Sequence, residues 1–124
     1  FVKTLRRHTG LSPDLFRAPG GDYERYISNG VDLPHIRWSV IGDAETLTRP
    51  SAIAVQVLRN TGHGDIVLLH DSEETTVASL KGMLAGLKQR GFRLATVEEM
   101  FRMQGIALEK GVSYNSAKPE HNPR

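Results

Sequence analysis

Asp65-Ile66-Val67-Leu68-Leu69-His70-Asp71-Ser72 is the stretch of sequence that decides the fold of this chain. Four consecutive apolar residues, from Ile66 to Leu69, are followed at once by His70 and Asp71. This pattern is typical of a buried strand that ends at a loop. In proteins built from alternating strands and helices, the residues that carry out chemistry lie where strands end and loops begin. The stretch therefore predicts a parallel sheet and makes His70 a candidate functional residue.

Further strands and helices are predicted on both sides of this strand. Apolar residues that recur at spacings of three and four predict a long helix over residues 73–89, and Arg49-Pro50 marks the start of another. The expected strands are 15–18, 36–41, 65–71 and 93–97, and the expected helices are 1–8, 22–28, 50–60, 73–89 and 98–104. Elements that alternate in this way call for parallel strands joined by right-handed crossovers, which is an α/β fold.

Composition limits the possible functions of the chain. Its 124 residues, 39% hydrophobic and 24% charged, fit one globular domain or part of one. The formal net charge of +2 and the single short basic run Arg6-Arg7-His8 argue against a nucleic-acid groove. The absence of cysteine excludes disulfides and thiolate metal sites, and no apolar run approaches the ~20 residues of a membrane span. The chain starts at Phe1 without a signal-peptide pattern, so we expect it to be a piece of a longer protein.

Several motifs occur in an order that carries a family resemblance. They are Leu15 to Gly21 (LFRAPGG), Trp38-Ser39-Val40, Gly64 to Asp71 (GDIVLLHD) and Gly91-Phe92-Arg93. Together they resemble the second half of the NodB-homology polysaccharide deacetylases, carbohydrate esterase family 4. The resemblance implies the second half of a distorted (β/α) barrel over residues 1–112. The composition of residues 113–124 predicts a flexible C-terminal tail.

The resemblance also implies a reaction, the hydrolysis of N-acetyl groups on peptidoglycan or chitin-like glycans. In the family a divalent metal, for which we expect zinc, polarises the acetyl carbonyl and a bound water, an aspartate takes the proton of that water, and a histidine protonates the leaving amine. The aspartate and the metal ligands belong to two upstream motifs, T-F-D-D-G and H-S-x-x-H, which do not occur in this sequence. We therefore expect no metal ligand here and a partnership with the upstream half of the domain, either covalent or as a separate chain.

The matching motifs assign roles to individual residues. Arg17 resembles the arginine that orients the catalytic aspartate, and His70 resembles the general acid. Gly20, beside Pro19, resembles the residue whose backbone N–H faces the developing oxyanion, and Leu68 resembles the apolar wall of the acetyl pocket. The ordinary alternatives are a surface arginine, a structural histidine and a core leucine.

The fourth motif departs from the family pattern. The family often shows Asp-x-x-Asp-Trp after Trp-Ser-Val, whereas this chain reads Ile41-Gly42-Asp43-Ala44-Glu45. Asp43 is the candidate for the aspartate that tunes the histidine, the alternative being an exposed loop carboxylate. Trp38 is either a core residue or a contact of the substrate. The candidate site is thus catalytic Arg17, Asp43 and His70, and substrate-binding Pro19, Gly20, Trp38 and Leu68.

Three functions from different classes remain for comparison. The first is the general-acid half of a polysaccharide deacetylase, which acts outside the cell or in its envelope and is inactive as an isolated piece. The second is a non-catalytic remnant that binds glycan or serves as a structural partner. The third is a phosphate-accepting receiver domain, but such a domain needs an acidic pair after its first strand, and no Asp or Glu precedes Asp14.

Overall fold

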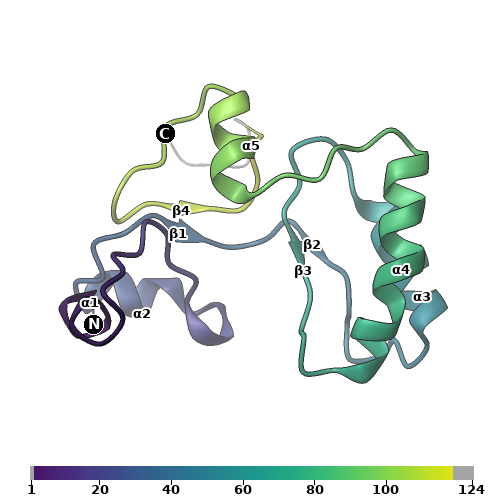
Figure 1. Ribbon diagram of the computed structural model, residues 1–124, viewed down its shortest axis with the longest axis horizontal. Coiled ribbons are helices and arrows are strands. Elements are labelled where there is room, and N and C mark those ends of the chain that lie inside the picture. The colour runs from purple at the N-terminus through teal and green to yellow at the C-terminus, as the bar shows by residue number, and fades with distance from the viewer. Residues whose placement is uncertain (1, 119–124) are drawn as a thin grey trace.

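The structure is a computed structural model that describes residues 2–118 of the chain. Its helices are α1 (Val2–Thr9), the short 3₁₀ turn η1 (Pro19–Gly21), α2 (Tyr23–Ser28), α3 (Pro50–Asn60), α4 (Glu74–Gln89) and α5 (Val97–Met103). Its strands are β1 (His35–Ile36), β2 (Val40–Ile41), β3 (Val67–Leu68) and β4 (Ser113–Tyr114). Figure 1 shows them in two groups, with β1, β4, α1, α2 and α5 on one side and β2, β3, α3 and α4 on the other. No helix within residues 2–118 is long and apolar enough to cross a membrane.

All the strand pairs are parallel, as predicted, but they are short and form two separate sheets. β1 pairs with β4, with His35 opposite Ser113, and β2 pairs with β3, with Ile41 opposite Leu68. Phe16 forms a parallel bridge with His35 on the other side of β1. The single strand predicted over 36–41 is therefore two strands, whose halves pair with different partners. The α/β class with parallel strands is confirmed.

Each group has its own hydrophobic core. In the first, Ile36, Phe101, Tyr114 and Ala117 pack together, which places α5 against β1 and β4. In the second, Val57 of α3 packs with Met83 and Leu87 of α4. Val67 and Leu69 pack against this second cluster, so these side chains of the β3 segment face the two helices. Since side chains alternate along a strand, Leu68 and His70 face the other side.

Local signals explain where the helices begin. Pro50 occupies the first turn of α3, where a missing N–H costs nothing. The Asp22 carboxylate accepts a hydrogen bond from the backbone N–H of Arg25 at the start of α2. Thr96 and Glu99 form a reciprocal capping box at the start of α5. These helices lie within one residue of their predicted bounds.

Three further sequence-based expectations were wrong. Residues 93–97 do not form a strand, and the predicted strand 15–18 contributes only the bridge at Phe16. Residues 113–118 are not a flexible tail, because β4 lies there and Tyr114, Ser116 and Ala117 are buried. The Tyr114 hydroxyl also accepts a hydrogen bond from the Glu109 N–H and donates one to the Ala107 carbonyl, which fixes this segment. The rest of the expected tail, 119–124, lies outside the described residues.

Candidate active site at the carboxyl ends of the strands

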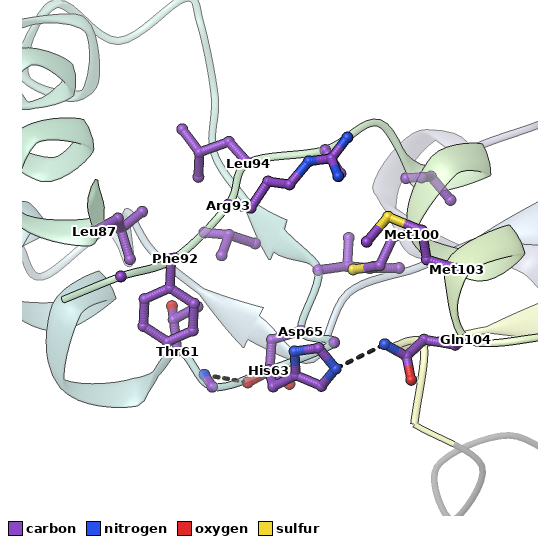
Figure 2. A pocket seen from close by; sticks show the side chains of 17 residues that line it. Thr61, His63, Asp65, Leu87, Phe92, Arg93, Leu94, Met100, Met103 and Gln104 are labelled. Atoms are coloured by element: carbon purple, nitrogen blue, oxygen red, sulfur yellow. Dashed lines mark hydrogen bonds between the residues drawn. The ribbon is translucent and has the colours of Figure 1, made fainter. Parts of the chain in front are cut away.

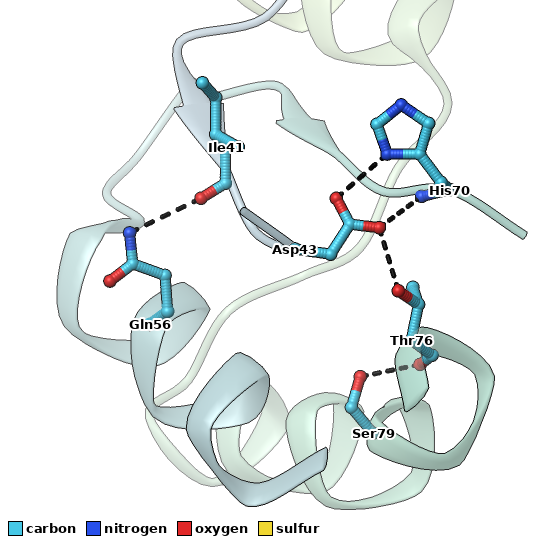
Figure 3. A network of polar contacts seen from close by, with 6 residues as sticks. All are labelled: Ile41, Asp43, Gln56, His70, Thr76 and Ser79. Atoms are coloured by element: carbon cyan, nitrogen blue, oxygen red, sulfur yellow. Dashed lines mark hydrogen bonds and ion pairs between the residues drawn. The ribbon is translucent and has the colours of Figure 1, made fainter. Parts of the chain in front are cut away.

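Asp43 and His70 meet where two neighbouring parallel strands end. Ile41 and Leu68 are register partners, so the residues two positions later emerge side by side on the same face. The Asp43 Oδ1 atom lies 3.1 Å from the His70 Nδ1 atom, and the His70 backbone N–H donates to Asp43 Oδ2 at 2.5 Å (Figure 3). Asp43, the candidate for the aspartate that tunes the histidine, is therefore in direct contact with His70.

Thr76, near the start of α4, completes the contacts of this carboxylate. Its hydroxyl donates to Asp43 Oδ2 at 2.9 Å, and its own carbonyl accepts from Ser79 at 2.6 Å. The side chain of Asp43 is only 3% exposed, whereas that of His70 is 53% exposed. A carboxylate only accepts hydrogen bonds, so His70 carries a proton on Nδ1 and its Nε2 atom is the one left for chemistry.

The electrostatics of the pair follow from these contacts. Burial raises the pKa of Asp43, but the hydrogen bonds from the His70 backbone, Thr76 and the His70 ring outweigh it, so its pKa lies below the usual 3.8. Asp43 is therefore a carboxylate at neutral pH. It fixes the orientation of the His70 ring and stabilises any positive charge that forms on that ring.

Gly42 allows β2 to pack closely against β3 and α3. A Cβ atom at Gly42 would lie 2.7 Å from Leu69 and 2.8 Å from Val57, closer than carbon atoms pack. Only a residue without a side chain lets β2 lie this close to β3 and α3. The sequence analysis gave Gly42 no role, because the contact depends on residues 15 and 27 positions further along the chain.

Arg17 forms a second group with Trp38. The exposed guanidinium lies over the indole ring, with Cζ 5.6 Å from the ring centroid. Gly21 has a positive φ of 75°, and a Cβ there would lie 2.7 Å from the Trp38 ring. Half-buried Trp38 therefore supports the loop that carries Arg17, which favours the structural reading of this tryptophan. Pro19 and Gly20 are exposed at the turn of that loop, and the space beside Gly20 is open.

Both groups lie at the carboxyl ends of parallel segments. Arg17 follows Phe16, which bridges β1, and Asp43 and His70 follow β2 and β3. Within residues 2–118 no hydrogen bond, ion pair or ring contact joins Arg17 or Trp38 to Asp43 or His70. The structure thus brings together Asp43 with His70 and Arg17 with Trp38, as two separate pairs.

Two apolar residues, Ile41 and Leu68, precede Asp43 and His70 by two positions on the paired strands. Leu68 is buried, as a pocket wall or a core residue would be, and its register partner Ile41 is 48% exposed. An exposed isoleucine on the strand next to the one that leads to His70 is a candidate apolar contact for a substrate. Sequence reasoning missed Ile41 and Thr76, because only the pairing of β2 with β3 and the docking of α4 place them here.

The described residues do not fit a metal site. Among residues 2–118 no group of three or more His, Asp or Glu side chains is arranged to hold a metal ion. Both carboxylate oxygens of Asp43 are already taken by His70 and Thr76. The chemistry that these residues offer is therefore proton transfer and orientation.

A second polar cluster lies at the opposite end of β3. Asp65 accepts hydrogen bonds from Lys118 at 2.7 Å, from the Ser39 hydroxyl at 2.8 Å and from the Gly62 N–H at 2.7 Å. Burial raises the pKa of Asp65, but these partners together lower it below its usual 3.8. The Asp65 side chain is only 6% exposed and that of Lys118 is 25% exposed, so a nearly buried carboxylate ties residues near 118 to β3.

The sequence of this chain is similar to those of proteins named as deacetylases. The chain is 37% identical over 102 residues to a peptidoglycan-N-acetylglucosamine deacetylase of Bacillus cereus, a match that covers 73% of this chain and 46% of the relative. It is 32% identical over 112 residues to a peptidoglycan-N-acetylglucosamine deacetylase of Listeria monocytogenes, with 90% and 23% covered. It is 34% identical over 107 residues to a bifunctional xylanase/deacetylase of Pseudobutyrivibrio xylanivorans, with 85% and 18% covered. The chain thus spans about a fifth to a half of these relatives, and no protein-family model matches it.

Solved structures share the fold. The Xyl-CE4 domain of a multidomain xylanase from the hindgut metagenome of Trinervitermes trinervoides superimposes with a TM-score of 0.78 at 26% identity, covering 94% of this chain and 58% of that one. A family 4 acetyl xylan esterase of Clostridium thermocellum, solved with a cobalt ion, gives 0.74 at 25% identity, with 93% and 58% covered. In both cases the chain corresponds to little more than half of the solved chain.

Proposed function

Because this chain belongs to the NodB-homology polysaccharide deacetylases of carbohydrate esterase family 4, as the C-terminal half of that domain, we propose that it supplies the general-acid side of a glycan de-N-acetylase. The observation that carries the proposal is the Asp43–His70 pair, with the Nδ1 atom of His70 held by a buried carboxylate. In this arrangement Nε2 is the exposed nitrogen: when the ring is doubly protonated, Nε2 donates its proton to the amine that leaves as the amide bond breaks, and the ring returns to the neutral form with its proton on Nδ1. Asp43 acts through His70 as a positioning residue.

The remaining site residues have complementary roles in this proposal. Arg17 orients the catalytic aspartate of the complete domain, a role suited to a guanidinium that is exposed and steadied by Trp38. The backbone N–H of Gly20, beside Pro19, faces the developing oxyanion. Leu68, together with Ile41, forms the apolar surface for the acetyl methyl group.

The names of the relatives and the metal in one solved structure support a proposal for the substrate and the metal. Two of the matched proteins are named as peptidoglycan-N-acetylglucosamine deacetylases, so we propose peptidoglycan or a chitin-like glycan as substrate and the cell envelope or exterior as location. One solved structure of the family holds a cobalt ion, and we propose a divalent metal, zinc, in the complete domain. Its ligands are expected in the half of the domain that this chain does not match, because the described residues do not form a metal site.

Replacing His70 by alanine in the complete domain tests the proposal. Loss of a general acid should lower the rate of acetate release from N-acetylglucosamine oligomers by about 10²-fold or more, with the metal content unchanged. His8→Ala is the matched control, since His8 is an exposed histidine of α1 away from the strand ends. An unchanged rate in His70→Ala would remove His70 from the mechanism.

A second candidate function is a non-catalytic remnant that binds glycan. The observation that favours it is Ala44, which stands where the family often has tryptophan next to the tuning aspartate. This function predicts that the complete domain binds N-acetylglucosamine oligomers in calorimetry but releases no acetate at any metal loading. Acetate release that depends on His70 would exclude it.

A further inference from the structure

Thr76 is a buried residue in the first turn of α4, and its hydroxyl is bonded to Asp43. The residue is 3% exposed, and the hydroxyl donates to Asp43 Oδ2 at 2.9 Å (Figure 3). The same oxygen accepts the backbone N–H of His70, whereas Asp43 Oδ1 faces the His70 ring. Thr76 therefore holds the carboxylate by the oxygen that the ring does not use.

The main chain links Thr76 to His70 by a short path. The His70 carbonyl accepts a hydrogen bond from the Glu73 N–H at 3.4 Å, which forms a turn between β3 and α4. Thr76 follows three residues later, and its own carbonyl accepts from the Ser79 hydroxyl at 2.6 Å. Main chain and hydrogen bonds thus form a closed chain of contacts through Asp43, His70 and Thr76. Rotation of the carboxylate away from the ring breaks its bond to Thr76.

The packing of α4 fixes the place of Thr76. Met83 and Leu87 of this helix share one hydrophobic core with Val57 of α3. The N-cap residue Glu73 makes no side-chain hydrogen bond to the first turn of α4. The partial positive charge of that turn therefore favours a carboxylate beside it. A hydroxyl held by a packed helix is a fixed donor to Asp43.

Loss of the Thr76 hydroxyl would leave the carboxylate of Asp43 poorly held. The carboxylate would keep two of the three hydrogen bonds that residues 2–118 give it. The Asp43 side chain is 3% exposed, so water has little access to replace the lost donor. Burial raises the pKa of Asp43, and Thr76 is among the donors that bring it below its usual 3.8. Without Thr76, the carboxylate is less stable in the one orientation that serves the His70 ring.

We propose that Thr76 is a positioning residue of the candidate active site, which acts through Asp43 to keep the proton of the neutral His70 ring on Nδ1. The hydrogen bond made by one ring nitrogen sets which nitrogen carries the proton. With the proton on Nδ1, Nε2 has a free lone pair after each proton transfer and can take up the next proton. The inference rests on the proposed function, because the position of the proton matters for catalysis only if Nε2 delivers it.

A purely structural role for Thr76 makes a different prediction. Threonine hydroxyls near a helix start can stabilise the helix itself, and their loss then lowers stability without changing a distant ring. Thr75 offers a matched comparison in the same turn of α4. It is half-buried, and its hydroxyl has no hydrogen-bond partner within residues 2–118. The same substitution at the two positions separates the two roles.

Nitrogen-15 NMR of the His70 ring in the full 124-residue chain tests the proposal. In alkaline solution, where histidine rings are neutral, the shifts of the two ring nitrogens report the ratio of the Nδ1–H form to the Nε2–H form. Thr76→Val keeps the shape of the side chain and removes its hydroxyl, so this ratio should fall about fivefold. Thr76→Ser keeps the hydroxyl and should retain the parent ratio, as should Thr75→Val. An unchanged ratio in Thr76→Val, or an equal fall in Thr76→Ser or Thr75→Val, would overturn the proposal.

His63 is an internal reference in the same spectra. It lies before β3, beside a cavity of about 470 Å³, and its ring contacts the Gln104 amide at 2.7 Å instead of a carboxylate (Figure 2). His70 follows the other end of β3, so the signals of His63 should stay unchanged in every variant. An equal change at both histidines would contradict a role confined to the Asp43–His70 pair.

The kinetics of the complete domain give a second readout. Thr76→Val should lower kcat for acetate release by about 3- to 5-fold with KM unchanged, and Thr76→Ser should restore it. The loss is smaller than that expected on removal of the Asp43 charge, because the carboxylate itself remains. An increase in KM at constant kcat would contradict a positioning role in proton transfer.

The failure of this inference can be told apart from that of the proposed function, because the ring is observed in the chain alone. A changed proton ratio in Thr76→Val, together with a complete domain that releases no acetate, would support the role of Thr76 in holding the pair and contradict the deacetylase activity. Acetate release that depends on His70, together with an unchanged ratio in Thr76→Val, would support the activity and overturn the positioning role.

Discussion

At the scale of single residues, Asp43 is the one on which the candidate site depends most. Its carboxylate is nearly buried and accepts hydrogen bonds from the His70 ring, the His70 backbone and Thr76. One side chain therefore fixes both the ring and the main chain of the histidine. The ring is held from one side only, and its other nitrogen stays exposed.

Replacing Asp43 by asparagine should lower turnover of the complete domain by about 10- to 100-fold, with little change in KM. The amide is similar in size but loses the charge that stabilises a protonated His70. Thr76→Val is the control, because it removes a hydrogen bond to Asp43 and leaves the charge of Asp43 in place. The kinetic parameters on an acetylated glycan, measured across pH, check this expectation. Equal effects of the two variants would show that the pair serves packing alone.

Complete motifs made Arg17 and His70 candidate site residues from sequence, and their roles stay predictions. The structure places Arg17 directly after the bridge at Phe16 and His70 after β3. Asp43 lies in an altered motif, and only the structure shows that it lies 3.1 Å from the His70 ring. Gly42, Ile41 and Thr76 gave no sequence signal, since their neighbours are set by strand register and helix docking.

At the scale of elements, helices were more predictable than strands. The bounds of α3 agree with the prediction to the residue, because Pro50 and the apolar spacing are local signals. Residues 93–97 have the composition of a strand but form none, because a strand needs a partner and residues 2–118 supply none there. The tail prediction failed at β4 because residues 113–118 are ordered by distant contacts, which polar composition does not reveal.

The ordering of β4 gives a second prediction. Tyr114→Phe should lower the free energy of unfolding by about 1 kcal/mol, because it leaves the Glu109 N–H without its acceptor. Tyr26→Phe is the control, since Tyr26 packs against Phe16 through its ring and its hydroxyl has no partner within residues 2–118. Urea unfolding of both variants measures the difference. Equal midpoints would mean that the Tyr114 hydroxyl contributes nothing to the fold.

At the scale of the whole molecule, the two groups of elements are joined by the segment that contains β1 and β2. Its first half pairs with β4 and its second half with β3, so both cores depend on one stretch of backbone. Asp65 strengthens this connection, because it holds Ser39 from that stretch and Lys118 from the C-terminal side. The class of fold was predictable from the alternation of elements, whereas this sharing of one segment was not.

Because the pKa values of Asp43 and Asp65 are lowered in the folded chain, the free energy of unfolding should decrease at acidic pH. A carboxyl group whose pKa is lower in the folded state adds stability above its unfolded value of 3.8 and loses that contribution as pH falls toward the folded value. The melting temperature should therefore be flat near neutral pH and fall steeply below about pH 4.

Asp65→Asn should make this acid dependence shallower while lowering stability at pH 7. Asp71→Asn is the control, since Asp71 is exposed after β3 and has no partner within residues 2–118. Thermal melts from pH 3 to 7 compare the two variants. The same steep decline in Asp65→Asn as in the parent chain would show that other groups cause the acid sensitivity.

Gly42 has a consequence for how this protein can evolve. Any side chain at this position collides with Leu69 and Val57 and displaces β2, which carries Asp43, so its effect on the candidate site is indirect. In a genetic selection for the proposed deacetylase activity of the complete domain after Gly42→Ala, second-site suppressors should therefore arise at Leu69 and Val57, as smaller residues. Substitutions at Gly42, Leu69 and Val57 are therefore expected to depend on one another, because the same contacts set the helix packing and the position of the candidate site.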